Sequence, residues 1–182
     1  MKQLIASLVC LASITLIAFS CERDDICPED VSTTPHLIIR FYDIENQNEF
    51  KSVRQLKITG IDEDGTILPE IPVNQTNPDS IVLPLRFQEE ATFTTTRFQL
   101  EKDSDFAENE NPNNDSNIDI ITVTYTPEFI YVSRACGYKS IFELTPISGV
   151  SRENDDDNWI SSAEIINQTI VNETEAHAII YH

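Results

Sequence analysis

The chain is poor in glycine and histidine, and each shortage removes a class of site. Its four glycines stand apart from one another, so no glycine-rich loop is present that could cradle a phosphate. The three histidines, His36, His177 and His182, show no His-x-x-x-His spacing, and no Cys-x-x-Cys pair accompanies them. Zinc-binding motifs are therefore missing, and surface or strand-end roles are expected for the histidines.

Basic residues are also scarce. Twelve Lys and Arg face thirty-one Asp and Glu, which gives a formal net charge of −19. Nucleic acid is excluded as a partner, because protein affinity for phosphates depends on Lys and Arg. Anionic headgroups would be repelled by the same charge, so no basic face for a membrane is expected.

Motifs of enzymes are missing as well. There is no Gly-x-Ser-x-Gly elbow for a nucleophilic serine. Paired carboxylates are abundant, but any acidic chain contains them, and a glycosidase needs two at a defined separation in a cleft. We therefore expect a protein without catalytic activity and without a cofactor.

The first twenty residues form an export signal. Lys2 precedes an apolar run from Leu4 to Phe19, and Ser20 precedes Cys21, which is the pattern of a signal peptide cleaved before a cysteine. We expect residues 1–20 to be removed, Cys21 to carry the lipid that holds the protein on a membrane, residues 21–35 to form a tether, and residues 36–182 to form one domain. The alternative is a secreted protein whose Cys21 is incidental.

The residues after Cys21 carry a resemblance. The run Cys21-Glu22-Arg23-Asp24-Asp25 resembles the lipoprotein export signal of Bacteroidetes-type bacteria. Together with the runs at 37–43 and 131–139, it is similar to a family of uncharacterised lipoproteins from those bacteria. The resemblance implies an outer-membrane location facing the cell exterior, with the periplasmic leaflet as the alternative, and it implies no molecular function.

Two cysteines remain for a disulfide. Cys10 leaves with the signal and Cys21 carries lipid, so Cys27 and Cys136 are the one pair available. An oxidising compartment favours a bridge between them. The alternative is that Cys136, beside Gly137, is a reactive thiol.

Period-2 alternation of apolar residues predicts about nine strands and little helix. The expected strands are 37–42, 56–58, 81–87, 92–100, 121–125, 130–132, 138–144, 165–171 and 178–181. Asp64-Gly65 indicates a hairpin, and Thr126-Pro127-Glu128 indicates a turn between two strands. Residues 159–166 allow a short helical turn instead of a strand.

These strands predict an all-β protein with a single β-sandwich of immunoglobulin-like architecture. A closed, lipocalin-like β-barrel is the alternative, because it needs the same alternation and differs only in which edges pair.

Two polar segments, 101–119 and 151–158, are long enough for functional or solvated loops. Oxygen ligands at Asp115, Asn117 and Asp119 are weak candidates for calcium, because the glycine and glutamate of an EF-hand loop are missing. Asp79-Ser80-Ile81 resembles a short O-glycosylation motif of exported proteins in these bacteria, which makes Ser80 a possible modified residue.

Three classes of function remain. The first is a non-catalytic accessory that binds an outer-membrane β-barrel or another envelope protein. The second is a carrier or capture protein for a small ligand, which requires a mostly apolar cavity. The third is an envelope hydrolase.

Overall fold

The computed structural model describes residues 26–28, 33–87, 89–106 and 114–182. The described part of the chain forms eleven strands: β1 (Leu37–Tyr42), β2 (Lys57–Ile61), β3 (Ile67–Glu70), β4 (Ser80–Leu83), β5 (Thr94–Lys102), β6 (Asn117–Ser133), β7 (Gly137–Leu144), β8 (Val150–Arg152), β9 (Ser162–Ile165), β10 (Thr169–Ile170) and β11 (Ala178–Tyr181). A 3-10 turn at Ser104–Phe106 is the one helical element described. No helix among these residues is long and apolar enough to cross a membrane.

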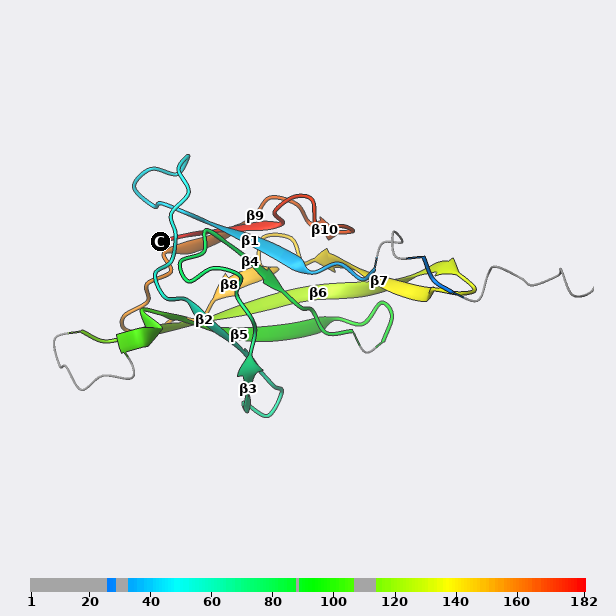
Figure 1. Cartoon of the computed structure of the whole chain (residues 1–182), viewed down its shortest axis with the longest axis horizontal. Coiled ribbons are helices and arrows are strands. Elements are labelled where there is room, and N and C mark those ends of the chain that lie inside the picture. The colour runs from blue at the N-terminus through cyan, green and yellow to red at the C-terminus, as the bar shows by residue number, and fades with distance from the viewer. Residues whose placement is uncertain (1–25, 29–32, 88, 107–113) are drawn as a thin grey trace, which may run out of the picture. The chain divides into compact units, whose positions relative to one another are not determined.

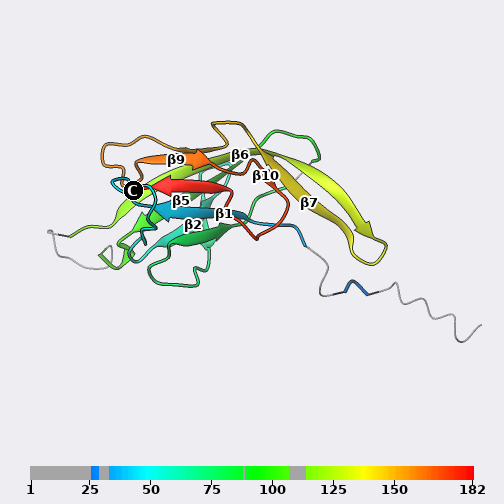
Figure 2. The same cartoon turned by 90° about the horizontal axis from the view of Figure 1, so that it is seen from above.

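Four strands make the first sheet, in the order β4-β1-β11-β9. β1 alternates between buried and half-buried residues along its whole length, as a strand with one face on a core does. It runs antiparallel to β4 and parallel to β11, with Ile39 opposite Ala178. Figure 2 shows β11, in red, between β1 and β9.

The second sheet has seven strands, in the order β10-β7-β6-β5-β2-β3, and β8 pairs with β6. The long ladder between β5 and β6 runs from Thr94 opposite Tyr125 to Lys102 opposite Asn117. β2 and β3 form the hairpin that Asp64-Gly65 predicts, and Gly65 has a φ of 86°, which suits glycine in a tight turn.

The two sheets stack as the layers of a β-sandwich and share one apolar core, as Figure 1 shows for β1 and β9 against β5 and β6. The largest wholly buried side chains come from both sheets: Phe41, Leu37 and Ile39 from the first, and Tyr125, Phe98 and Phe142 from the second. Burial of each such side chain contributes about 1.5–3 kcal/mol. This core fixes the positions of the strand ends and of the loops that connect them.

The predicted sandwich is confirmed, whereas the lipocalin-like alternative is wrong. Both sheets are open, with β4 and β9 at the edges of one and β10 and β3 at the edges of the other. The alternative of a short helical turn at 159–166 is also wrong, because Ser162–Ile165 pairs with β11 as β9.

The predicted turn at Thr126-Pro127-Glu128 is wrong, because β6 runs through it without a break. Proline removes a ladder donor, so it is tolerated in a strand only where that donor has no partner. β5 ends its pairing with β6 at Thr94 opposite Tyr125, and Pro127 lies beyond that end. Its carbonyl instead accepts the N–H of Ala91 at 2.9 Å.

The chain divides into two compact units. One contains Tyr131–Tyr138, which is the tip of the β6–β7 hairpin, together with the N-terminal segment, of which residues 26–28 are described. The other contains Ser32–Ile130 and Lys139–His182 and holds the sandwich core. The predicted boundary between a tether and a domain at residue 36 stays a prediction.

Candidate functional site

A groove of about 500 Å³ lies where the end of β2 and the start of β5 meet the loop between β4 and β5. Its lining combines acids, two arginines and an aromatic ring: Ile61, Asp62, Glu63, Arg86, Glu89, Thr92, Phe93, Thr94, Thr95 and Arg97. The groove is open and mixed in charge, unlike the mostly apolar cavities that take small ligands.

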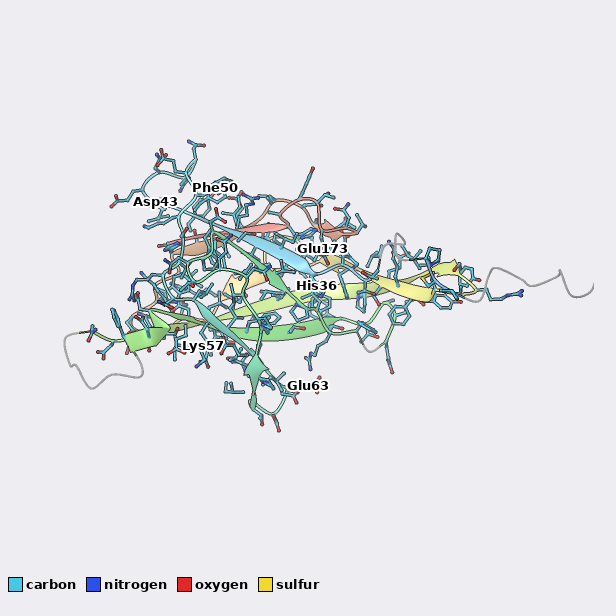
Figure 3. All side chains as sticks on the ribbon, viewed as in Figure 1. His36, Asp43, Phe50, Lys57, Glu63 and Glu173 are labelled. Atoms are coloured by element: carbon cyan, nitrogen blue, oxygen red, sulfur yellow. A yellow bond between two sulfur atoms is a disulfide. The ribbon has the colours of Figure 1, made fainter. Side chains whose placement is uncertain are left out.

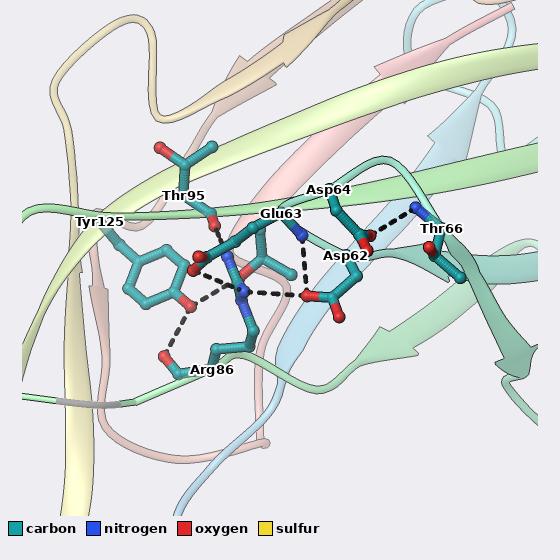
Figure 4. Close-up of polar contacts among 8 residues, drawn as sticks. Asp62, Glu63, Asp64, Thr66, Arg86, Thr95 and Tyr125 are labelled. Carbon is teal, nitrogen blue, oxygen red and sulfur yellow. Dashed lines mark hydrogen bonds and ion pairs between the residues drawn. The ribbon is translucent and has the colours of Figure 1, made fainter.

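Arg86 is the central side chain of the groove (Figure 4). Its Nη1 lies 3.1 Å from Oε1 of Glu63 and 3.7 Å from Oδ1 of Asp62. Its Nη2 donates a hydrogen bond to the carbonyl oxygen of Thr95. The guanidinium thus joins the β2–β3 turn to β5. Its positive charge is already neutralised by Glu63 and Asp62, so it does not offer a binding site for an anion.

Tyr125 of β6 bonds to the β4–β5 loop, which contains Arg86. Its hydroxyl donates to the carbonyl oxygen of Arg86 at 2.6 Å and lies 2.7 Å from Oγ1 of Thr96. Burial raises the pKa of the Tyr125 phenol, so the group stays neutral and available as a donor. Its ring packs edge-on against Phe142 at 5.3 Å.

The rest of the β4–β5 loop is fastened to β6. The N–H of Ala91 donates to the carbonyl oxygen of Pro127, and the N–H of Phe129 donates to Oε1 of Glu90 at 3.3 Å. Leu85 turns into the core and is buried. The loop is therefore held by backbone and side-chain bonds at several points along its length.

Two phenyl rings nevertheless project from this fastened loop. Phe87 is 54% exposed and Phe93 is 67% exposed. Phe87 packs edge-on against Phe129 of β6, with ring centroids 6.3 Å apart. Phe93 instead lines the groove with Thr95 and Arg97, and no described contact joins it to the other two rings. Because all three rings lie in or beside the β4–β5 loop, we call Phe87, Phe93 and Phe129 together the phenylalanine surface.

The second arginine of the groove is also paired. Arg97 donates from Nε and Nη2 to the two carboxylate oxygens of Glu153, at 2.7 and 2.9 Å. Glu153 also accepts from the hydroxyl of Thr122. These bonds hold the pKa of Glu153 below its usual range, with the contact to Arg97 as the main cause.

The three histidines hold structural positions. Nδ1 of His36 lies 2.6 Å from Oε1 of Glu173, and Figure 3 labels both residues. Nδ1 of His177 accepts the N–H of Ile38 at 3.0 Å, and Nε2 of His182 lies 3.1 Å from the carbonyl oxygen of Lys51. None of these contacts sets a histidine beside a serine or cysteine nucleophile.

The calcium candidates are not brought together as a site. Asp115 is exposed, whereas Asp119 is buried and accepts hydrogen bonds from backbone N–H groups at 159 and 160. Nδ2 of Asn117 donates to the carbonyl oxygen of Asp157. Among the residues described, no group of three acidic, histidine or cysteine side chains is placed to hold a metal ion.

The remaining predicted sites are the disulfide, the possible O-glycosylation site and the lipidation signal. A disulfide joins Cys27 to Cys136, whose Cα atoms are 4.7 Å apart, so the predicted pairing is present. Ser80 is half-buried at the start of the edge strand β4. The lipidation residue Cys21 and the export residues Glu22, Arg23, Asp24 and Asp25 lie outside the described residues.

Sequence reasoning missed the phenylalanine surface. The alternation of 81–87 predicted a strand that places Phe87 on a buried face, but β4 ends at Leu83. Pro84 was the available signal, because proline lacks the N–H that continues a ladder. The expected strand 92–100 includes Phe93, whereas β5 begins one residue later, at Thr94.

Comparison with known proteins adds a family and no function. No curated protein matches the chain, and no solved structure matches it. A model of a family of unknown function, DUF6452, matches residues 55–182, which include every strand from β2 to β11. Since that match covers more than half of the sequence, the chain belongs to the DUF6452 family.

Proposed function

We propose that the protein is a non-catalytic, lipid-anchored accessory of the cell envelope that binds a partner protein through the phenylalanine surface. The exposure of Phe87 and Phe93 on a loop fastened to β6 carries this proposal. Removing an exposed aromatic ring from water is favourable, so such a ring gains free energy when a partner covers it. Aromatic anchors at the centre of an interface supply much of its binding energy.

The fastening of the loop strengthens the argument. Ordering a loop on binding costs free energy, and a loop that is already held in place avoids that cost. Tyr125, Pro127 and Glu90 supply the bonds that hold this loop in the free protein. The phenyl rings are thus already in place before a partner binds, as in a preformed binding surface.

Charge suggests the chemistry of the partner. Exposed acids lie near these rings, in a chain of net charge −19. Glu63 and Glu89 line the groove with Phe93, Glu90 accepts the N–H of Phe129, and Glu128 precedes Phe129 in β6. A complementary partner would present an apolar pocket with a basic rim. An anionic lipid surface or a nucleic acid would be repelled.

The groove supports binding more than catalysis. Both of its arginines are held in ion pairs, Arg86 with Glu63 and Arg97 with Glu153. The three histidines contact Glu173, the N–H of Ile38 and the carbonyl oxygen of Lys51. The carrier alternative has less support, because the groove is open and lined mainly by charged and hydroxyl side chains.

The location rests on the residues around Cys21. The run Cys21-Glu22-Arg23-Asp24-Asp25 supports a lipid on Cys21 and display from the outer membrane. Cys21→Ala should abolish acylation and leave the protein unprocessed or released. Full lipid labelling of that variant would contradict the anchor.

Site-directed photocrosslinking in cells tests the binding surface. We replace Phe93 or Phe87 with p-benzoylphenylalanine and, as controls, the comparably exposed Ile67 and Ile166. A discrete adduct with one envelope protein is expected from positions 87 and 93 and not from the controls.

The purified pair then gives the affinity. Phe93→Ser should weaken binding at least tenfold, whereas Ile67→Ser should leave it within twofold. Equal crosslinking at all four positions, or equal affinity of the two variants, would contradict the proposal.

A further inference from the structure

The disulfide connects the N-terminal segment to the tip of the β6–β7 hairpin. Cys27 is bonded to Cys136, and Cys136 lies in the tight connection between Ser133 and Gly137. The N–H of Cys136 also donates to Oγ of Ser133 at 3.0 Å, which closes the tip on itself. Whatever holds the N-terminal segment therefore also holds this tip.

Sequence length limits how far the tip can be from a lipid on Cys21. Cys27 is six residues after Cys21. Six residues span at most about 20 Å, whatever their conformation. The headgroup region adds only about 5–8 Å on each side of the hydrocarbon core, so the tip is confined to the neighbourhood of the membrane surface.

The composition of the tip differs from that of the chain. The described residues of this unit are 26–28 and 131–138, and they include no aspartate or glutamate and one cation, the exposed Arg134. Ile26 is 81% exposed, Tyr131 is 57% exposed and Tyr138 is 70% exposed. The acids of this unit, Glu22, Asp24, Asp25, Glu29 and Asp30, all belong to the segment around residues 26–28 and lie outside the described residues. The hairpin tip itself, 131–138, therefore exposes apolar and aromatic groups and carries no acid.

Tyr131 and Tyr138 are the kind of side chain found at the boundary between a membrane and water. Their rings pack edge-on with centroids 5.4 Å apart. A tyrosine ring is apolar at its body and polar at its hydroxyl, and this side chain is enriched where hydrocarbon meets water at membrane surfaces. Arg134, which lies between the two tyrosines in the sequence, can contact lipid phosphates.

We infer that the hairpin tip, Tyr131–Tyr138 with Ile26, is a membrane contact that the Cys27–Cys136 disulfide holds in the lipid headgroup region. This inference rests on the lipid anchor of the proposed function and does not depend on the phenylalanine surface. The anchor supplies the attachment, and the tip sets which part of the protein faces the bilayer.

Quenching by brominated lipid tests the contact. The full lipidated protein carrying Tyr138→Trp is reconstituted in phosphatidylcholine vesicles with and without lipids brominated on their acyl chains. After subtraction of the emission of Trp159 in the parent protein, the added tryptophan should be blue-shifted and quenched at least twofold. Phe93→Trp is the matched control, because Phe93 is similarly exposed and belongs to the other unit.

Each outcome decides a separate point. Quenching at position 138 that is no stronger than at position 93 would overturn the inference. A blue shift without quenching would also overturn it, because it would mean contact with another copy of the protein. The mass of the N-terminal peptide tests the lipid anchor separately from the membrane contact. An acylated protein without quenching overturns the membrane contact alone. A protein without acyl chains overturns the lipid anchor and the membrane contact together.

A longer tether tests the confinement. Inserting about twenty Gly and Ser residues between Asp25 and Ile26 leaves the disulfide and the lipid in place, and it adds roughly 70 Å of reach. Quenching of the Tyr138→Trp protein should then fall at least twofold. Unchanged quenching would overturn the role of the short tether.

Discussion

The buried carboxylate of Asp119 shows how one side chain can organise a distant segment. It accepts hydrogen bonds from the N–H of Ile160 at 2.7 Å, the N–H of Trp159 at 3.3 Å and Nδ2 of Asn158 at 3.3 Å. Burial raises the pKa of Asp119, and these three donors oppose that rise in part. Asp119 therefore acts as an acceptor for the segment that leads into β9.

We expect Asp119→Ala to be among the most damaging single substitutions outside the apolar core. It would leave buried N–H groups without an acceptor, at a cost of about 3 kcal/mol in the free energy of unfolding. Urea denaturation of the purified protein measures this. Asp115→Ala removes the same charge from an exposed position and should change stability by less than about 0.5 kcal/mol. Equal effects of the two variants would contradict the structural role.

Sequence could predict which face Asp119 occupies but not what it does there. The period-2 pattern Asp119-x-Ile121-x-Val123 places it on the core side of β6. Its donors, however, come from residues about forty positions later, and no local pattern announces that contact. The same limit applies to the weak calcium candidates Asp115, Asn117 and Asp119, because spacing alone does not show that the carboxylate of Asp119 already accepts backbone N–H groups.

Among the elements, strands with one buried face were the most predictable. β1, β5 and β11 lie where alternation predicts them, within a few residues. β3 was missed because all four of its residues are exposed, so it has no alternation to detect. The continuity of β6 through Pro127 was missed because the effect of a proline depends on whether a neighbouring strand needs its N–H.

The β4–β5 loop depends on one phenolic hydroxyl, and Tyr125→Phe tests this. The substitution keeps the ring in the core but removes the bonds to the carbonyl oxygen of Arg86 and to Thr96. We expect the free energy of unfolding to fall by about 1–1.5 kcal/mol. Hydrogen exchange should accelerate in the loop, at the amide of Ala91, more than in β1.

A matched tyrosine controls for loss of a hydroxyl. The hydroxyl of Tyr181 contacts Glu164 at 3.4 Å on the surface, so Tyr181→Phe should cost less than about 0.5 kcal/mol. Uniform acceleration of exchange in both β1 and the loop would show that Tyr125 supports the whole fold and not the loop in particular.

For the whole molecule, titration divides the pH scale into two regions. Hydrogen bonds and ion pairs lower the pKa of Asp105, Glu153 and Glu173. A carboxylate with a lowered pKa stabilises the fold above its unfolded pKa, and that contribution is lost as pH falls through the folded value. These groups therefore affect stability in the acid range, whereas His177 and His182 affect it near neutrality.

His177 and His182 should make the protein less stable as pH falls below about 6.5, the usual pKa of histidine. Burial lowers the pKa of both, so the unfolded chain binds protons in this range and the folded chain does not. The free energy of unfolding should fall by up to about 1.4 kcal/mol for each histidine between pH 7.5 and 5.5. Asp119 acts in the opposite direction, because a carboxyl group with a raised pKa adds stability as pH falls through its folded value.

The variant His177→Gln isolates one of these contributions. It removes the titrating ring whose Nδ1 accepts the N–H of Ile38, so it lowers stability at every pH but flattens the pH dependence. Urea midpoints at pH 7.5 and 5.5 should differ less in the variant than in the parent, by up to about 1.4 kcal/mol in unfolding free energy. Between pH 7.5 and 8.5, where a histidine of lowered pKa is neutral in both states, the two proteins should show the same change. A parent-like pH dependence in His177→Gln would mean that the buried imidazole is not what limits stability in weak acid.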